Sequence, residues 1–305
     1  MNFKLLGTAA GGGFPQWNCA CTLCDLCRSA PRIVPPRLQL QAAFSDQPEN
    51  WFLINASPDI RFQIEANPEL QPSPRHGQRN TPIQAIILTS ADLDQTLGLL
   101  LLREFQPLTV YATRLVRQTL EANSFFRMLH RVPNQLTWIE ISPGQEFALG
   151  ENITCVPIPI SGSLPHYARL PGSDSRPDED SGQAALGLLI QAHGRSLAYT
   201  PSLPEVTPAL LSLYRSCDVI LVDGTFWSDA ELNRTHSGTP LARSIGHIPM
   251  SGDDGTIALL ADITSPQKIF IHLNNTNPVL DPRTPEYKSL HDAGWQIGHD
   301  GWQLK

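Results

Sequence analysis

The stretch LTSADLDQTLGLL, residues 88–100, joins two segments that differ in apolar periodicity. The run PIQAIILTS is apolar and rich in β-branched residues, which predicts a buried strand that ends at Ser90. Apolar residues at helical spacing begin near Thr96, so we expect a helix to follow. The turn between strand and helix carries four polar residues, Ser90, Asp92, Asp94 and Gln95. Turns of this kind often hold catalytic or binding side chains, and we expect such residues here.

The rest of the chain also alternates between strand and helix patterns. Short β-rich runs recur throughout, and helical patterns lie at residues 96–105, 114–129, 205–216 and 253–263. This order predicts an α/β fold in which two mixed β-sheets pack together with helices on the outer faces. We expect a single domain over residues 1–305, because the polar, glycine- and proline-rich segment 170–182 is typical of a surface loop.

Composition and charge narrow the range of partners. The chain has 305 residues, is 41% hydrophobic and has no apolar run near the roughly eighteen residues that span a bilayer, so we expect no membrane partner. Its N-terminus has one lysine and an apolar stretch broken by glycines, which does not fit a signal peptide and favours a cytoplasmic location. The net charge of −7 and the lack of a basic cluster argue against nucleic-acid binding and against a tRNA-processing nuclease.

Four of the six cysteines crowd into one short segment. Cys19, Cys21, Cys24 and Cys27 form the pattern CxCxxCxxC, and six cysteines are too few for a disulfide scaffold in a chain this long. Thiolates at this spacing can converge on one tetrahedral ion, most often Zn²⁺. We therefore predict a structural zinc site in a cysteine loop at about residues 19–27. Free buried cysteines and an iron–sulfur cluster are the alternatives.

Polar residues also follow three other strand-like runs. Asp223 follows VILV, His272 follows KIFI, and Ser161 follows ITCVPIPI. An aspartate or histidine at a strand end often serves only as a turn or capping group. The order of a strand–turn–helix bearing Asp94, then Asp223, then His272 resembles the way in which the metallo-β-lactamase fold presents its metal site.

Five longer motifs make that resemblance more specific. They are GTAAGGGFPQWNCACTLC at 7–24, NASPDIR at 55–61, LVDGTFW at 221–227, GHIPM at 246–250 and IHLNNTNP at 271–278. Together they resemble the pyrroloquinoline quinone (PQQ) biosynthesis protein B family, a branch of the metallo-β-lactamase superfamily, over essentially the whole chain. The resemblance implies an αββα sandwich and a role in maturing PQQ from a crosslinked Glu–Tyr peptide precursor. It implies either an iron-dependent hydroxylase of the tyrosine ring or a carrier of PQQ towards the periplasm.

The resemblance also suggests the zinc ligands. The family's three cysteines match Cys19, Cys21 and Cys24, and Cys27 is an additional cysteine. A related phosphodiesterase branch supplies its fourth ligand from a histidine three residues after the strand-end histidine, a place that Asn275 takes here. The fourth zinc ligand is thus either Cys27 or Asn275.

The active-site turn departs from the superfamily pattern HxHxDH. Ser90, Asp92 and Gln95 stand in its three histidine places, and only Asp94 is kept. The ligands that remain for one ion are Asp92, Asp94, Asp223 and His272. This oxygen-rich set suits Fe²⁺ or Mn²⁺ better than Zn²⁺.

Roles for the individual side chains follow from this set. We expect Asp92, Asp94 and His272 to be the catalytic residues, with Ser90, Gln95, Ser161 and His247 in the substrate pocket. The expected partner is a tyrosine-derived peptide precursor or PQQ, and a homodimer is one assembly that the sequence allows. Because Gln95 is a weak metal ligand, a non-catalytic carrier is the main alternative to a hydroxylase. Hydrolysis by a β-lactamase-type dizinc centre is disfavoured, because the histidines of its first site are missing.

Overall fold

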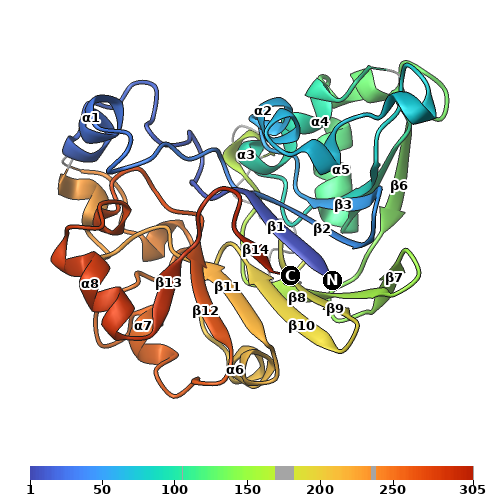
Figure 1. Ribbon diagram of the computed structural model, residues 1–305. Coiled ribbons are helices and arrows are strands. Elements are labelled where there is room, and N and C mark those ends of the chain that lie inside the picture. Colours follow the sequence, from blue (N-terminus) through green and yellow to red (C-terminus); the bar gives the residue numbers. More distant parts are fainter. Residues whose placement is uncertain (105, 169–181, 235–237, 305) are drawn as a thin grey trace. The chain divides into compact units, whose positions relative to one another are not determined.

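The structure, a computed structural model, describes residues 1–104, 106–168, 182–234 and 238–304 (Figure 1). The predicted loop 170–182 lies outside these residues except for Gly182, and so does Phe105 at the end of the helix predicted over 96–105. The chain divides into two compact units, each built from separate segments. Unit 1 comprises Met1–Leu6, Gln41–His193 and Gly301–Lys305, and unit 2 comprises Gly7–Leu40 and Gly194–Asp300. Within the described residues the strands form two sheets of seven strands each.

Unit 1 contains the first of these sheets and the helices next to it. The strands of unit 1 are β1 (Asn2–Gly7, whose last residue belongs to unit 2), β2 (Gln41–Gln47), β3 (Asn50–Ile54), β4 (Ile83–Ile87), β5 (Leu108–Ala112), β6 (Leu136–Glu140), β7 (Phe147–Leu149), β8 (Ile153–Ile160), β9 (Ala185–Ala192) and β14 (Gln303–Leu304). Of these, β7, β8 and β9 belong to the second sheet. Its helices are α2 (Ile60–Glu65), α3 (Leu93–Thr96), α4 (Gly98–Leu101) and α5 (Arg114–Ala122), with 3₁₀ turns η1 (Pro68–Leu70), η2 (Pro74–His76), η3 (Phe126–His130) and η4 (His166–Ala168).

The first sheet has the order β14-β1-β2-β3-β4-β5-β6. The pairs β1/β14 and β2/β3 are antiparallel, whereas β3/β4, β4/β5 and β5/β6 are parallel, so the sheet is mixed. The carboxyl ends of parallel strands meet at one edge of a sheet, which brings the residues after β3 and β4 together. This edge carries Asn55 and the turn that starts at Thr89.

The helices α2, α4 and α5 lie beside this sheet (Figure 1), and a buried apolar core fixes them to it. The core combines side chains of β3, β4 and β5 with side chains of α2, α4 and α5, among them Leu53, Ile86, Val110, Ile60, Leu99, Val116 and Leu120. Val116 and Leu120 are four residues apart and therefore face the same side of α5. The hydroxyl of Thr113 caps this helix by accepting a hydrogen bond from Val116 N. Burial of each such aliphatic side chain stabilises the folded state by about 1.5–3 kcal/mol.

Unit 2 contains parallel strands that alternate with helices. Its strands are β10 (Arg195–Thr200), β11 (Val219–Asp223), β12 (Gln267–Ile271) and β13 (Trp295–Ile297). Its helices are α1 (Thr22–Ser29), α6 (Pro208–Arg215), α7 (Thr256–Leu259) and α8 (Pro285–Asp292), with 3₁₀ turns η6 (Glu231–Arg234), η7 (Arg243–Ile245) and η8 (Pro278–Leu280). Adjacent strands from β10 to β13 are all parallel.

The register of these strands places two predicted site residues side by side. Asp223, the last residue of β11, pairs with Ile271, the last residue of β12. His272 follows directly, so both functional groups emerge at the carboxyl edge of the parallel strands. On the neighbouring strand, the hydroxyl of Thr200 lies 2.6 Å from that of Tyr214, which joins β10 to α6.

Several local predictions need correction. The helix predicted over 114–129 ends at Ala122, because Asn123 adopts an extended conformation, and a separate 3₁₀ turn follows. The helix predicted over 205–216 starts later, at Pro208 behind the cap of Thr207, and the one over 253–263 shortens to α7. The cysteine loop predicted at about 19–27 is helical from Thr22 onward. None of the helices within the described residues has the length and apolarity needed to cross a bilayer.

Candidate functional site

The turn after β4 is held by a chain of hydrogen bonds within unit 1. The hydroxyl of Ser90 lies 2.7 Å from Asp92 Oδ2 and donates to it, and the same hydroxyl accepts from Asp92 N. Asp92 is the residue before α3, yet its side chain does not cap that helix. The hydroxyl of Thr96 donates to the Asp92 carbonyl at 2.8 Å. The turn therefore fixes the backbone of Asp92 while its carboxylate is directed to Ser90.

Gln95 is buried and its side-chain carbonyl already accepts a hydrogen bond from a neighbouring hydroxyl. Its Oε1 atom accepts from Thr89 Oγ1 at 2.5 Å and lies 3.1 Å from Ser90 Oγ. The amide of Asn55 donates to Thr89 Oγ1 at 3.0 Å, and the backbone N–H of Thr89 donates to Asn55 Oδ1 at 2.8 Å. Asn55 has a left-handed backbone with φ 66°. Gln95 is 5% exposed, so it forms part of the wall of the turn. In this arrangement its oxygen is engaged within the protein.

Tyr167 contacts this turn from another part of the chain, and the sequence did not reveal this contact. It lies in η4, and its hydroxyl donates to the Ala91 carbonyl next to Asp92. Burial is the main cause that raises the pKa of Tyr167 to about 12, and the nearby negative charge of Asp92 adds to it. Ser161, which we predicted to line the pocket, is exposed directly after β8. The loop that contains Tyr167 has no motif that separates it from other surface loops, so only the fold identifies this contact.

In unit 2, Asp223 is fully buried and is surrounded by donors. Its Oδ1 atom accepts from Thr225 Oγ1 at 2.6 Å and from Thr225 N at 3.1 Å. Its Oδ2 atom accepts from Leu203 N at 3.1 Å and pairs with His247 Nδ1 at 2.7 Å. Burial alone would raise the pKa of Asp223, but the charge of His247 and the hydrogen bonds of His247 and His272 outweigh it and hold the pKa well below its usual value.

Two histidines complete this cluster. The Nδ1 atom of His272 lies 2.7 Å from Thr225 Oγ1 and 3.8 Å from Asp223 Oδ1. The rings of His247 and His272 stack with centroids 5.6 Å apart. Asp223, His247 and His272 each offer a ligand atom within 4.8 Å of the others, which is close enough to hold one metal ion. His247 thus joins the residues that could bind the ion, a role beyond the pocket contact predicted for it.

The predicted active-site ligands are divided between the two units. Asp92 and Asp94 belong to unit 1, whereas Asp223 and His272 belong to unit 2. A shared site of all four remains a prediction.

The second group of potential ligands in the described part of the chain is the cysteine centre of unit 2. Cys19, Cys21 and Cys24 each place a sulfur within 4.8 Å of the other two. Cys27 lies one turn further along α1, is buried, and is outside this group. Burial, the largest cause, raises the pKa of the Cys24 thiol to about 11. For Cys19, hydrogen bonds from Cys21, Cys24 and Asn275 outweigh the effect of burial and lower its pKa.

The amide of Asn275 lies at the fourth corner of this centre. Its Nδ2 atom is 3.3 Å from Cys19 Sγ, 4.0 Å from Cys21 Sγ and 3.4 Å from Cys24 Sγ. A tetrahedral zinc ion with bonds of about 2.3 Å to sulfur and about 2.1 Å to oxygen would separate sulfur from oxygen by about 3.6 Å. A half-turn of the amide would place Oδ1 where Nδ2 lies, so the donor set fits Zn²⁺.

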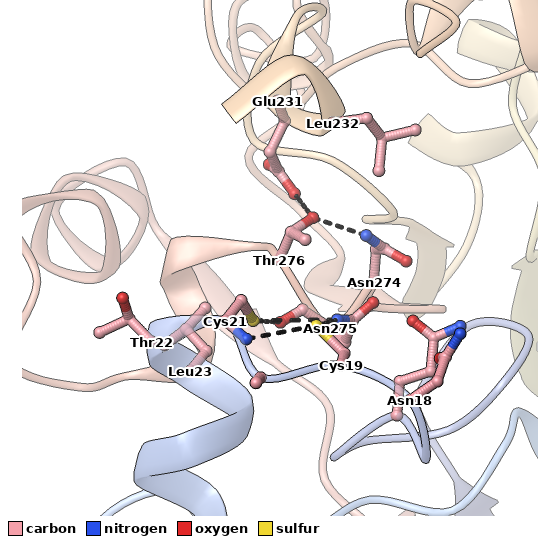
Figure 2. Close-up of a pocket in the computed structure, with 12 residues that line it drawn as sticks. Asn18, Cys19, Cys21, Thr22, Leu23, Glu231, Leu232, Asn274, Asn275 and Thr276 are labelled. Atoms are coloured by element: carbon pink, nitrogen blue, oxygen red, sulfur yellow. Dashed lines mark hydrogen bonds between the residues drawn. The ribbon is translucent and has the colours of Figure 1, made fainter. Parts of the chain in front are cut away.

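A pocket of about 820 Å³ borders the cysteine centre (Figure 2). Its walls come from the cysteine segment, from η6 and from the residues after β12. Cys19 and Cys21, both half-exposed, line it beside Asn275. Further along, the Thr276 hydroxyl donates to Glu231 Oε1 at 2.6 Å. The pocket gives solutes and metal ions a route to the thiols.

Comparisons with known proteins agree with the family resemblance of the sequence. Residues 50–273 match the model of the β-lactamase superfamily domain. The chain is 39% identical to the coenzyme PQQ synthesis protein B of Methylobacterium nodulans, and 100% of each chain is covered. It is 40% identical to the same protein of Methylobacterium radiotolerans, over 100% of this chain and 99% of the relative. The chain belongs to the coenzyme PQQ synthesis protein B family. The resemblance found in the sequence is thereby confirmed.

A solved structure of this PQQ synthesis protein B family confirms the fold. The zinc-bound PqqB of Methylobacterium extorquens is 37% identical, covers 100% of both chains and superposes with a TM-score of 0.92. A diphosphatase of the PhnP family is 18% identical with a TM-score of 0.65, over 99% of this chain and 96% of that one. The human short-form tRNase Z is 13% identical with a TM-score of 0.58, over 100% of this chain and 99% of that one. These last two share only the metallo-β-lactamase fold, which has the predicted two mixed sheets with helices.

Proposed function

We propose that this chain acts in PQQ biosynthesis, where it carries out a metal-dependent hydroxylation of the tyrosine ring of a peptide-derived precursor. The pathway is that of its curated relatives, which are named coenzyme PQQ synthesis protein B. The observation that supports a metal-dependent reaction is the buried group of Asp223, His247 and His272, whose ligand atoms lie within 4.8 Å of one another. A buried carboxylate between two imidazoles suits a metal ion better than it suits a purely structural core.

The active-site ion would be held by Asp92, Asp94, Asp223 and His272. Fe²⁺, or Mn²⁺ in its place, would supply the redox chemistry that ring hydroxylation by dioxygen requires. The chain's own residues keep these ligands in place: Ser90 holds the Asp92 carboxylate, and Thr225 lies between Asp223 and His272. The backbone N–H groups of Leu203 and Thr225 and the ring of His247 hold the Asp223 carboxylate in its position. Ser90, Gln95, Ser161 and His247 are proposed to line the substrate pocket.

The cysteine centre is proposed to hold one structural Zn²⁺. Its ligands would be Cys19, Cys21, Cys24 and Asn275, because the amide of Asn275 lies at the fourth corner and Cys27 lies outside the group. The zinc named for the relative from M. extorquens agrees with zinc binding in this family. Four protein ligands close the coordination shell, so this ion would stabilise the segment and take no part in the reaction.

A non-catalytic carrier of PQQ or its precursor is the second candidate. The observation that favours it is the side chain of Gln95, whose oxygen accepts from Thr89 and lies 3.1 Å from Ser90 Oγ where the superfamily has a metal-binding histidine. A pocket that lacks this ligand could keep its binding function and lose turnover.

Oxygen uptake by anaerobically purified protein separates the two candidates. We expect Fe²⁺ together with the precursor to start oxygen consumption, and Asp94→Ala or His272→Ala to abolish it while the zinc content stays unchanged. His76→Ala is a matched control, since His76 is an exposed histidine paired with Glu49. No oxygen uptake in the native protein, with tight binding of PQQ, would favour the carrier.

A further inference from the structure

The hydroxyl of Thr225 lies between the carboxylate of Asp223 and the ring of His272. Its Oγ1 atom is 2.6 Å from Asp223 Oδ1 and 2.7 Å from His272 Nδ1. All three side chains are buried, with Thr225 3% exposed, Asp223 0% and His272 8%. A buried donor without an acceptor, or a buried acceptor that faces another acceptor, costs free energy. The hydrogens of these three side chains must therefore lie between a donor and an acceptor.

The direction of the two hydrogen bonds follows from counting donors. Asp223 accepts backbone N–H groups on both oxygens, from Thr225 on Oδ1 and from Leu203 on Oδ2. An ionised carboxylate only accepts, so the single hydroxyl hydrogen of Thr225 points to Asp223 Oδ1. The lone pairs of Oγ1 then face His272, and Nδ1 of that ring must supply the hydrogen. A neutral imidazole with Nδ1 protonated carries its lone pair on Nε2.

The backbone keeps the two residues in this arrangement. His272 has a left-handed conformation with φ 59°, which is rare for a residue with a side chain. The N–H of Asn274 donates to the Thr225 carbonyl at 3.1 Å, and the N–H of Gly224 donates to the Ile271 carbonyl at 2.8 Å. These bonds connect the segment after β11 to the segment after β12 on both sides of the pair.

We propose that Thr225 is a positioning residue that fixes His272 in the tautomer with Nδ1 protonated and Nε2 available as a ligand atom. Metal ligation by Nε2 rests on the proposed function, but the tautomer itself does not. An acceptor for the N–H of the second ring nitrogen commonly orients metal-binding histidines, and here a hydroxyl backed by a carboxylate would be that acceptor.

The tautomer can be measured in the metal-free protein by ¹⁵N NMR of labelled histidine rings. Thr225→Val keeps the shape of the side chain and removes the hydroxyl, whereas Thr225→Ser keeps the hydroxyl. We expect His272 to be Nδ1-protonated in the native protein and in Thr225→Ser, and to lose this preference in Thr225→Val. An Nε2-protonated ring in the native protein, or no change in Thr225→Val, overturns the proposal.

Thr200→Val is the matched control, because Thr200 is a buried threonine at the end of neighbouring β10 whose hydroxyl bonds Tyr214. It should leave the signals of His272 in place. In a second measurement with Mn²⁺ alone, Thr225→Val should bind about tenfold more weakly than the native protein, and Thr225→Ser should bind normally. A shifted tautomer with unchanged Mn²⁺ binding would support the role of Thr225 and reject His272 as a ligand, so the two proposals can fail separately.

Discussion

The side-chain carbonyl of Gln95 accepts a hydrogen bond from the hydroxyl of Thr89 at 2.5 Å. In the superfamily pattern a histidine at this place binds metal, whereas here the residue faces a polar wall. Thr89 also contacts Asn55, and Ser90 also contacts Asp92. Both hydroxyls therefore keep a partner if Gln95 is replaced, and the substitution can be tested in an intact turn.

Gln95→His should raise the affinity for Fe²⁺ by about tenfold, because an imidazole nitrogen is a stronger ligand than a carboxamide oxygen. The same change should lower the free energy of unfolding by about 1 kcal/mol, since the hydrogen bond from Thr89 to Oε1 is lost. Anaerobic iron titration and urea unfolding would measure the two effects. Gln135→His is the control, because Gln135 is buried elsewhere in unit 1 and bonds the Arg103 carbonyl. Unchanged iron affinity in Gln95→His would favour the carrier.

Cys21→Ser should reduce zinc from about one ion per chain to a small fraction and should lower the thermal unfolding temperature, because a structural site contributes its binding energy to folding. Cys27→Ser should retain the zinc, since Cys27 lies outside the sulfur group. Elemental analysis of both variants measures this directly. Zinc loss in Cys27→Ser together with full zinc in Asn275→Ala would reverse the assignment of the fourth ligand.

Alkylation of zinc-free protein at about pH 8 should modify Cys19 before Cys24. The thiolate is the reactive form. Hydrogen bonding lowers the pKa of Cys19, whereas burial raises the pKa of Cys24 to about 11, so the rate for Cys24 should rise only at more alkaline pH. Mass spectrometry of iodoacetamide-treated protein gives the order, and deeply buried Cys155 should react last. Faster modification of Cys24 would contradict the described environment, and added zinc should protect both residues.

Gly224→Ala should destabilise unit 2 by about 1–3 kcal/mol, because an added methyl group overpacks the site. An ideal Cβ there would lie 2.5 Å from Met250 Cε and 2.8 Å from Phe270 Cβ. Gly224 separates Asp223 from Thr225, so the strain should also weaken Mn²⁺ binding. Chemical unfolding and metal titration test the two parts, and a variant with native stability would show that the strands can separate at no cost.

The family, the two-sheet fold and the strand–turn–helix at 82–100 could all be predicted from sequence, because apolar periodicity and short motifs encode them locally. The convergence of Cys19, Cys21 and Cys24 was equally readable, since these residues are close along the chain. Thr225 was not identified, because a hydroxyl between a carboxylate and an imidazole exists only when β11 and β12 pair in a particular register. The same holds for Tyr167, whose partner Ala91 is 76 residues away.

The hydrogen-bond partner of Gln95 also could not be predicted from its position in a motif. Sequence comparison indicates that a ligand is missing, but it does not indicate what the substitute binds. The hydroxyl that donates to Gln95 comes from Thr89, which has no counterpart in the HxHxDH pattern. Local sequence thus located the site, whereas the partners of each side chain depend on the packing of the turn.

Only two residues, Leu273 and Asn274, separate His272 from Asn275, so the histidine of one centre and the amide of the other share a single short segment. Removing zinc from the cysteines would release the far end of that segment and disturb the backbone that orients His272. A chelator could therefore inactivate the protein without ever touching the active-site ion. Loss of activity in EDTA, and its recovery on adding zinc, would not identify zinc as the catalytic metal unless the two centres were analysed separately.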